Sequence, residues 1–435
     1  MGNMTSRLAS LRAFLPMLTS YGASGASLVM SSVAQLMTFA ILARFLGVNE
    51  FSLFVAITAV SNIAVHLCGL GASECLVRRV ARDHAMYPAL LGHNIILISI
   101  TGILLVLSGT AILPFFFQLA ESRSQNYLLI VTMLVTNIIL VRAILFTEQV
   151  FIALSEFGSA NKMVIGFAFI RTAAAVLACI CFDVSTLQGW IFWQLGAHLV
   201  FFAASILVLR PLGRPIFCIV REELPLGLYF SIPFILKAAR QNVDLLVLSL
   251  VTGAEIVASY SVARRIVESS YLSVDALNRI LYPGTAKASI GGIHNAAERV
   301  KKILLAALAI SILAAIAIFL LAPVLPYLFG HDYTSLVTFV RYLCGALIPV
   351  ACWAIALEAL GAAGHQGARG AVLGGGSLLG AGFAAWATWY AAPTGTLISY
   401  YIIEIAMAAA AWLVYLHVVL KSRVGNPIRT GVPAE

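Results

Sequence analysis

The sequence predicts an all-α polytopic membrane protein with twelve transmembrane helices in two six-helix bundles. Three observations support this prediction. First, 61% of the 435 residues are hydrophobic and only 10% are charged, whereas a soluble domain has about 25% charged residues. Second, apolar stretches long enough to cross a bilayer recur along the whole chain. Third, the two halves of the sequence match each other at one constant offset.

Each apolar stretch has about 20 residues or more, which is the length that a helix needs to cross the hydrocarbon core. The last two stretches are divided only by the turn Ala392-Pro393-Thr394-Gly395. The first stretch lacks a cleavage pattern of small residues, so we expect it to be retained. The expected spans are residues 20–43, 50–72, 91–117, 127–153, 163–182, 187–209, 227–252, 255–278, 300–322, 333–360, 366–392 and 394–419.

Basic residues outside these spans fall on alternate loops, and only Arg44 and Arg123 lie on the other side. The positive-inside rule places the basic side in the cytoplasm. Both termini are then cytoplasmic, as an even number of spans requires. The basic residues of this side are Arg7, Arg12, Arg78, Arg79, Arg82, Lys162, Arg210, Arg214, Arg221, Arg279, Lys287, Arg299, Lys301, Lys302, Arg369, Lys421, Arg423 and Arg429.

A single offset relates the two halves of the chain, because it places Gln35 on Gln241 and Gly158 on Gly364. Each half would contain six spans, so both enter the membrane from the same side. We therefore expect a pseudo-two-fold axis along the membrane normal. The predicted domains are an N-terminal bundle at 1–209, a cytoplasmic linker at 210–226, a C-terminal bundle at 227–420 and a cytoplasmic tail at 421–435.

The seventh and eighth expected spans each carry a stripe of charge along one helical face. An Arg, Lys or Asp at mid-membrane costs about 2.5–3.5 kcal/mol, so such residues remain only where they face a partner or a water-filled cavity. The offset aligns them with polar faces on the first two spans, which include Gln35 and Asn62. We predict a central, cationic cavity between the halves. The two stripes are Lys237, Arg240, Gln241 and Asp244, and then Arg264, Arg265, Glu268 and Asp275.

Several function classes are disfavoured. The loops are too short for a soluble catalytic domain, so the protein is expected to be a transporter and not an enzyme. The seven cysteines are scattered, with no metal-ligand spacing, and no metal or other cofactor is expected. The net charge of +9 is accounted for by the sides of the membrane, and nucleic acid is not an expected partner.

Residues 43–54, Ala-Arg-Phe-Leu-Gly-Val-Asn-Glu-Phe-Ser-Leu-Phe, resemble the first-hairpin signature of the Wzx-type polysaccharide flippases, although Ser52 stands where Gly is expected. This family belongs to the superfamily that includes the MATE multidrug exporters and the lipid II flippases. Residues 69–71, Gly-Leu-Gly, and 76–79, Leu-Val-Arg-Arg, resemble the end of the family's second helix. The resemblance extends over the whole chain.

The resemblance implies a MATE-like pair of six-helix bundles. It also implies that the protein moves an undecaprenyl-pyrophosphate-linked oligosaccharide across the bacterial inner membrane by alternating access. The product would enter lipopolysaccharide or exopolysaccharide synthesis, with a polysaccharide polymerase and a chain-length regulator as candidate protein partners. Cationic residues on the seventh and eighth spans are implied to meet the pyrophosphate.

The charged stripes suggest how such a substrate would be bound. Arg240 is expected to pair with Asp244, and Arg264 with Glu268, at i, i+4 spacing. At least one cation is then left without a partner, and a guanidinium suits bidentate contact with phosphate. The alternative is that these residues form structural ion pairs between the bundles. The predicted substrate-binding set is Lys237, Arg240, Arg264, Arg265, Gln35, Gln241 and Asn62, with Arg265 and Lys237 as its main members.

Asp244, Glu268 and Asp275 are candidates for exchange of H⁺ or Na⁺, because a carboxylate in the membrane field can couple transport to an ion gradient. The alternative is that each only neutralises a neighbouring cation. Pro233 lies one turn before the first stripe and is a candidate hinge.

Other charges lie in apolar segments, and single charges near span ends usually reach the interface. Arg142 and Arg341 lie deeper in their segments and are further candidates for the cavity, whereas Arg171, Glu358 and Glu404 are not assigned to it. Two rival functions stay open. One is a multidrug or organic-ion exporter of the same superfamily, and the other is a membrane-embedded polysaccharide polymerase or ligase.

Overall fold

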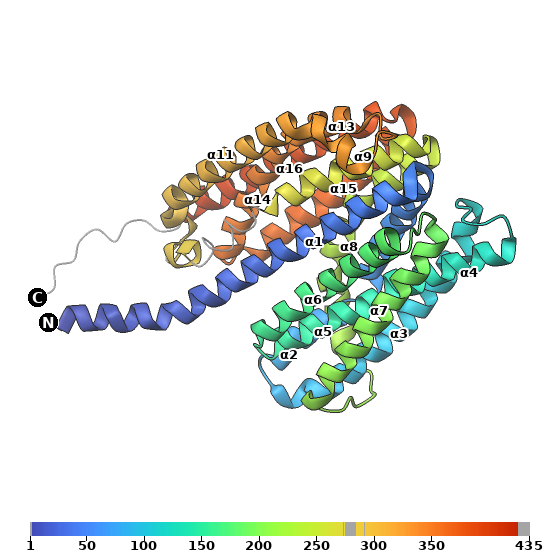
Figure 1. Cartoon of the computed structure of the whole chain (residues 1–435). Helices are drawn as coiled ribbons and strands as arrows, with labels where there is room; N and C mark the ends of the chain where they lie inside the picture. Colours follow the sequence, from blue (N-terminus) through green and yellow to red (C-terminus); the bar gives the residue numbers. More distant parts are fainter. Residues whose placement is uncertain (1, 273, 275–283, 291, 425–435) are drawn as a thin grey trace, which may run out of the picture.

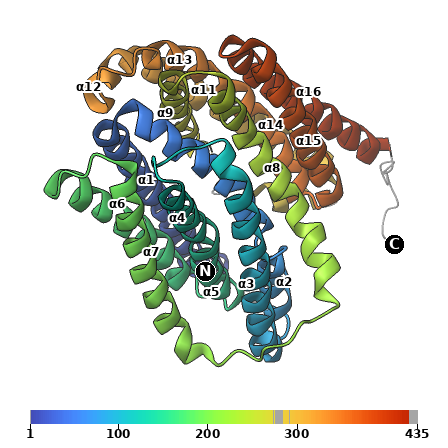
Figure 2. The same cartoon turned by 90° about the vertical axis from the view of Figure 1, so that its right-hand side faces the viewer.

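The computed structural model describes residues 2–272, 274, 284–290 and 292–424, and within them the chain is helical with no strand. The helices form two halves that lie side by side (Figures 1 and 2). The N-terminal half consists of α1 (Gly2–Leu67), α2 (Ala72–Val80), α3 (Tyr87–Ile112), α4 (Arg123–Leu134), α5 (Val141–Ala153), α6 (Phe157–Ala175) and α7 (Leu187–Leu209). The C-terminal half consists of α8 (Glu223–Val251), α9 (Ala254–Ser270), α11 (Ala297–Leu321), α12 (Leu325–Phe329), α13 (Leu336–Leu343), α14 (Leu347–Ala362), α15 (Gln366–Ala391) and α16 (Thr394–Val424).

The first two expected spans are joined into α1, which changes direction at Gly47. The backbone there has φ 70° and ψ 172°. This conformation favours glycine, because an L side chain rarely adopts a positive φ. A Cβ at this position would meet nothing within 4 Å, so the requirement for glycine comes from the backbone. The turn reverses the chain and lets its two arms run alongside each other.

Nine helical segments among the described residues are long and apolar enough to cross a membrane. One of them, Val29–Leu67, contains the Gly47 turn and covers the first two expected spans. The helices α8 and α9 are not among the nine, because α8 carries several charges and α9 has only 17 residues. The all-helical, membrane-spanning class of fold is confirmed among the described residues, while the count of twelve spans and the internal repeat stay predictions.

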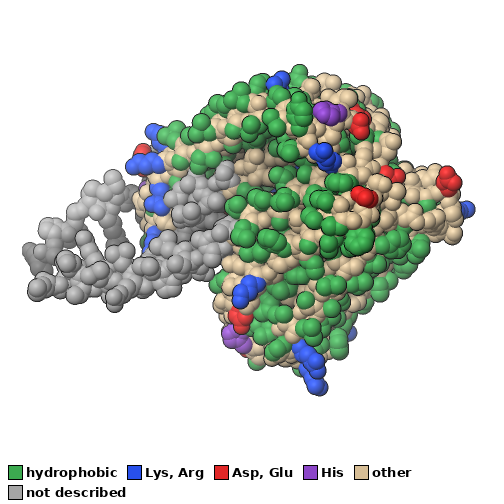
Figure 3. All heavy atoms as spheres, viewed as in Figure 1, with side chains coloured by type: hydrophobic (Ala, Val, Ile, Leu, Met, Phe, Trp, Pro, Cys, Tyr) green, Lys and Arg blue, Asp and Glu red, His purple; other side chains and the backbone are tan. Residues whose placement is uncertain are grey.

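The outer surface matches a membrane protein (Figure 3). Hydrophobic side chains cover most of its flank, and basic side chains gather at its left and lower ends. The loop between α7 and α8 and the start of α11 lie toward these ends (Figure 1), and they carry the exposed Arg214, Lys301 and Lys302. These three members of the predicted cytoplasmic set are therefore exposed at the ends where basic side chains gather, while the orientation of the chain in the membrane stays a prediction.

The halves meet along a surface that we call the seam, where α1 and α2 face α8 and α9, and where Arg171 of α6 lies near Arg265 of α9. At the end of the seam near the Gly47 turn, the Tyr333 hydroxyl donates a hydrogen bond of 2.6 Å to the carbonyl oxygen of Ala43. Nearby, Arg44 Nη1 donates one of 2.7 Å to the carbonyl oxygen of Tyr327. These contacts join the halves at the end opposite the basic loops (Figure 1).

The helix α8 contacts both halves. Near its start, Gly227 lies so close to Gly71 that a Cβ on Gly71 would come within 2.0 Å of the Gly227 carbonyl oxygen. Glu223 in the same turn pairs with Arg78 of α2 at 3.3 Å. Beyond Pro233, α8 contacts both halves, since Arg240 packs against Gly380 of α15 and Asn242 bonds to Asn62 of α1. The predicted hinge residue therefore lies between the close contact at Gly227 and the charged stretch that also contacts the C-terminal half.

Candidate functional site

A cavity with charged walls lies inside the C-terminal half, and we call it the C-half cavity. It has a volume of about 320 Å³ and is lined by α8, α9, α14, α15 and α16. The sequence predicts a cavity between the halves that the first two spans also line. Among the described residues, the lining of the C-half cavity includes none from α1, so Gln35 and Asn62 do not line it, and neither does Arg265. Its charged lining residues are Lys237, Arg240, Arg264, Arg369, Asp244, Glu268, Glu358 and Glu404.

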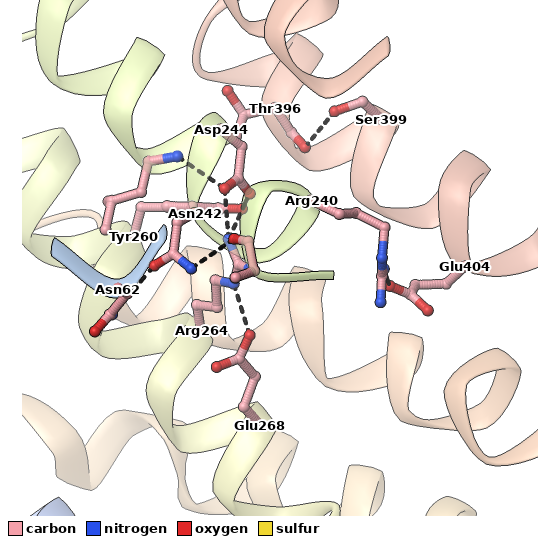
Figure 4. Close-up of polar contacts among 12 residues, drawn as sticks. Asn62, Arg240, Asn242, Asp244, Tyr260, Arg264, Glu268, Thr396, Ser399 and Glu404 are labelled. Atoms are coloured by element: carbon pink, nitrogen blue, oxygen red, sulfur yellow. Dashed lines mark hydrogen bonds and ion pairs between the residues drawn. The ribbon is translucent and has the colours of Figure 1, made fainter. Parts of the chain in front are cut away.

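Arg264 is the centre of one ion-pair network in this cavity (Figure 4). Its Nη1 lies 2.6 Å from Asp244 Oδ1, and its Nε donates to Glu268 Oε1 at 2.8 Å. The Tyr260 hydroxyl donates a further bond of 2.6 Å to Asp244 Oδ2. The predicted pairing of Arg264 with Glu268 is present, and Asp244 of α8 adds a second carboxylate from another helix.

Arg240 forms a second network, with a partner that differs from the expected one. Its guanidinium pairs with Glu404 of α16 and not with Asp244, because Asp244 is already held by Arg264 and Tyr260. The indole Nε1 of Trp353 donates to the other Glu404 oxygen at 2.7 Å. Glu404 is only 2% exposed, so this carboxylate does not reach the membrane interface. A buried charge of this kind requires a charged, hydrogen-bonded partner.

A third ion pair is more accessible. Arg369 Nη2 of α15 lies 2.8 Å from Glu358 Oε1 of α14, and both side chains are about a third exposed. The described lining of the C-half cavity thus contains four cationic and four anionic side chains. Its charges balance, which corrects the expectation of a cavity with an excess of basic groups.

An excess of positive charge occurs instead at the seam. Arg265 of α9 turns away from the C-half cavity and donates from Nη2 to Gln35 Oε1 of α1 at 2.7 Å. Arg171 of α6 lies over the Phe167 ring, with its guanidinium carbon 5.5 Å from the ring centroid. Arg171 and Arg265 are near enough to repel each other. We call these two side chains the seam arginines.

Neither of the seam arginines has a carboxylate within 4.0 Å among the residues that the structure describes. The Nε atom of Arg265 is buried and has no hydrogen-bond partner there. Two neighbouring guanidinium groups without a carboxylate partner are a candidate site for an anion. The sequence reasoning missed Arg171, because a lone Arg in an apolar segment does not reveal which helix it meets.

The other predicted residues lie near these two regions. Gln241 lines the C-half cavity, and so does Lys237, which interacts electrostatically with His66. Asn62 lies on the seam, where its amide donates to Asn242 Oδ1 at 3.3 Å. Asp275 lies outside the described residues.

A smaller cavity of about 180 Å³ lies between α1, α2, α5 and α8. Its walls include His66, Glu74, Arg142 and Glu148. Glu74 lies on α2, outside the candidate spans, and burial raises the pKa of its carboxyl above the usual value although the positive charge of Arg142 opposes this. Arg142 thus lines this smaller cavity and not the C-half cavity.

Arg341, the other deep arginine, does not line a cavity. Its side chain is exposed and lies over the ring of Phe319, 4.9 Å from the centroid. Across the described part of the chain, no group of three or more His, Cys, Asp or Glu is placed to hold a metal ion.

Comparison with known proteins identifies the family. A family model described as polysaccharide biosynthesis protein matches residues 19–287, which is more than half of the chain. The chain belongs to the polysaccharide biosynthesis protein family. A search of curated protein sequences found no significant match.

Solved structures confirm the fold. An inward-facing MATE family multidrug resistance transporter of the MOP superfamily matches with a TM-score of 0.75 and 16% identity, over 91% of this chain and 96% of that one. The lipid II flippase MurJ in an inward closed conformation matches with a TM-score of 0.70 and 13% identity, over 92% and 90%. A MOP superfamily transporter from Pyrococcus furiosus, described as having a binding pocket of reverse polarity, matches with a TM-score of 0.62 and 14% identity, over 93% and 96%. This member of the polysaccharide biosynthesis family therefore has the fold of the MOP superfamily transporters.

Proposed function

We propose that the protein is a flippase that moves an undecaprenyl-pyrophosphate-linked oligosaccharide across the bacterial inner membrane for surface polysaccharide synthesis. The observation that carries the proposal is the pair of seam arginines. They come from opposite halves of the molecule, lie near enough to repel each other and have no carboxylate partner within 4.0 Å among the described residues. Membership of the polysaccharide biosynthesis family and the MOP fold support the same function.

The physical argument starts from the cost of charge inside a membrane. A single Arg at mid-membrane costs about 2.5–3.5 kcal/mol, and two facing guanidinium groups add repulsion to that cost. A diphosphate carries several negative charges and accepts bidentate hydrogen bonds from Arg. It therefore offsets both the cost of placing arginine in the membrane and the repulsion between the two guanidinium groups. A cationic drug would instead add to the repulsion, and this argues against the multidrug exporter.

The position of the pair also suits alternating access. A ligand held by one Arg from α6 and one from α9 is bound by both halves, so its binding energy depends on how the halves are arranged. A transporter needs this property, because a ligand shifts a conformational equilibrium only when its affinity differs between the states. Bending of α8 at Pro233 would move its two segments relative to each other, and H⁺ or Na⁺ exchange would supply the driving force.

Among the predicted ion-exchange residues, Glu268 is the better candidate. Its side chain is 34% exposed and makes one ion pair, whereas Asp244 is held by Arg264, by Tyr260 and by the backbone N–H of Leu245. A carboxylate that is held less tightly takes up and releases a cation more readily.

The test is transport in liposomes that contain the full chain and a fluorescent undecaprenyl-pyrophosphate oligosaccharide, with pH, Na⁺ and voltage gradients imposed separately. We expect Arg171→Gln and Arg265→Gln each to slow transport about tenfold to hundredfold, because each removes charge-assisted hydrogen bonds worth about 1.5–3 kcal/mol. Arg341→Gln is the matched control, since this exposed arginine lies against the outer Phe319 ring. Full transport by the Arg171→Gln/Arg265→Gln double variant would refute the proposal.

A further inference from the structure

We infer that the C-half cavity is a binding site for an uncharged sugar, the one attached directly to the pyrophosphate. This inference rests on the proposed function and divides its substrate between two places. The seam arginines hold the anionic part, and the C-half cavity holds the neutral part.

The charge of the cavity excludes an anion as its ligand. The guanidinium groups of Arg240, Arg264 and Arg369 are each engaged by a carboxylate of the same cavity. An anionic ligand would have to displace one of these carboxylates, and a cationic ligand would have to displace a guanidinium. Breaking a buried pair leaves an uncompensated charge, which is strongly unfavourable. The cavity therefore suits a ligand without net charge.

The remaining walls suit a sugar ring. Trp353 and Tyr400 place aromatic side chains on the cavity, and both are partly exposed. A guanidinium lies over one face of each ring, Arg240 at 6.0 Å from the Trp353 centroid and Arg264 at 5.5 Å from the Tyr400 centroid, so the opposite face is the one proposed for the sugar. Sugar rings present C–H groups on their faces and hydroxyl groups around their edge, so an aromatic face and a set of polar groups bind them together. Glu268, Glu358 and Arg369 are each about a third exposed and can accept from or donate to hydroxyl groups. The volume of about 320 Å³ lies at the lower end of the range for small-molecule sites.

The helix α9 connects this cavity to the seam. Arg264 points into the C-half cavity, and the next residue, Arg265, points to Gln35 of the other half. Consecutive Cα atoms are about 3.8 Å apart, and successive side chains on a helix point about 100° apart. A diphosphate held by Arg265 therefore brings the first sugar to the wall that carries Arg264. The two parts of one lipid-linked substrate thus fit two adjacent sites.

The test measures binding to the full-length purified protein. The probes are undecaprenyl pyrophosphate without sugar, the same lipid carrying glucose, galactose or N-acetylglucosamine, and the same lipid carrying glucuronate. We expect at least one neutral-sugar probe to bind about tenfold more tightly than the bare lipid, which corresponds to about 1.4 kcal/mol. We expect the glucuronate probe to bind no more tightly than the bare lipid. The inference is overturned if no neutral sugar adds affinity, or if glucuronate adds as much.

Two variants locate the sugar. Trp353→Ala is expected to abolish the gain in affinity and to leave binding of bare undecaprenyl pyrophosphate within about twofold. Trp353→Phe keeps an aromatic face but loses the bond to Glu404, and is expected to retain most of the gain. Trp389→Ala on the exposed face of α15 is the matched control. If the neutral sugar still increases the affinity of Trp353→Ala, the sugar does not bind in the C-half cavity.

The two proposals fail separately. If Arg265→Gln binds bare undecaprenyl pyrophosphate as tightly as the wild type, the proposed function is wrong. The sugar site is then judged with neutral methyl glycosides of the same sugars, which contain no phosphate. A saturable change in tryptophan fluorescence that is lost in Trp353→Ala supports the site, and the absence of any such change overturns it.

Discussion

The charged side chains inside the C-terminal half and those at the seam differ in how they are neutralised. In the C-half cavity, Arg264 has two carboxylates within 2.8 Å, and Arg240 has Glu404. At the seam, Arg265 bonds to the amide oxygen of Gln35, has no carboxylate partner among the described residues and lies near the like charge of Arg171. Arginines in the same fold thus have opposite electrostatic surroundings. The paired groups hold helices together, and we propose that the unpaired groups bind the substrate.

The largest expected effect comes from removing a paired cation. Arg264→Met leaves the buried Asp244 without its guanidinium, so we expect a loss of about 3–5 kcal/mol of stability. Thermal unfolding of the detergent-solubilised protein, followed by tryptophan fluorescence, measures the change. If Arg264→Met unfolds at the wild-type temperature, the network does not stabilise the C-terminal half.

A second variant separates the charge pair from its packing. Arg240→Met alone leaves Glu404 as an unpaired buried carboxylate, and we expect a loss of about 3–5 kcal/mol. Adding Glu404→Leu removes the second charge, and we expect much of that loss to be recovered. The single variant Glu404→Leu completes the comparison. If the double variant loses as much stability as Arg240→Met and Glu404→Leu lose together, the assignment of this pair is contradicted.

The seam arginines should behave in the opposite way. Arg265→Gln or Arg171→Gln removes repulsion and breaks no ion pair among the described residues, so we expect unfolding temperatures equal to or above that of the wild type. The same thermal assay, run beside Arg264→Met, makes the comparison direct. A large destabilisation of either seam variant would show that these residues are structural.

The smallest effect concerns Glu74, whose pKa burial raises in the folded protein. Between the unfolded and the folded pKa, the folded protein binds more protons, so its stability falls as the pH rises through this window. Glu74→Gln removes this term and should unfold at a higher temperature than the wild type at pH 7, with the difference vanishing below about pH 4. A variant that is less stable than the wild type at pH 7 would contradict the assignment.

Much of the fold follows from the sequence, because apolar length and the sorting of basic loops are properties of the chain itself. The i, i+4 pair of Arg264 and Glu268 is equally local, and the structure contains it. The pairing of Arg240 with Glu404 is not local, since it depends on how α16 packs against α8. For the same reason, the sequence did not reveal that Arg171 faces Arg265.

The charged cavity lies inside the C-terminal half and not between the halves, for a related reason. A helical stripe shows that charges share a face, but neighbouring residues on α9 divide between two sides of the helix. Arg264 faces the C-half cavity and Arg265 faces the seam, so the residues of one predicted stripe belong to two different regions. Only the packed structure separates the two groups and shows that one of them is charge-balanced.

The most direct test of the role of the seam arginines compares two lipids that differ only in their headgroup. Undecaprenyl pyrophosphate and undecaprenol are offered to the purified wild type and to the Arg171→Gln/Arg265→Gln variant, and bound lipid is quantified by native mass spectrometry. We predict that the wild type prefers the diphosphate by at least about tenfold and that the variant loses most of this preference. An unchanged preference in the variant would contradict the account.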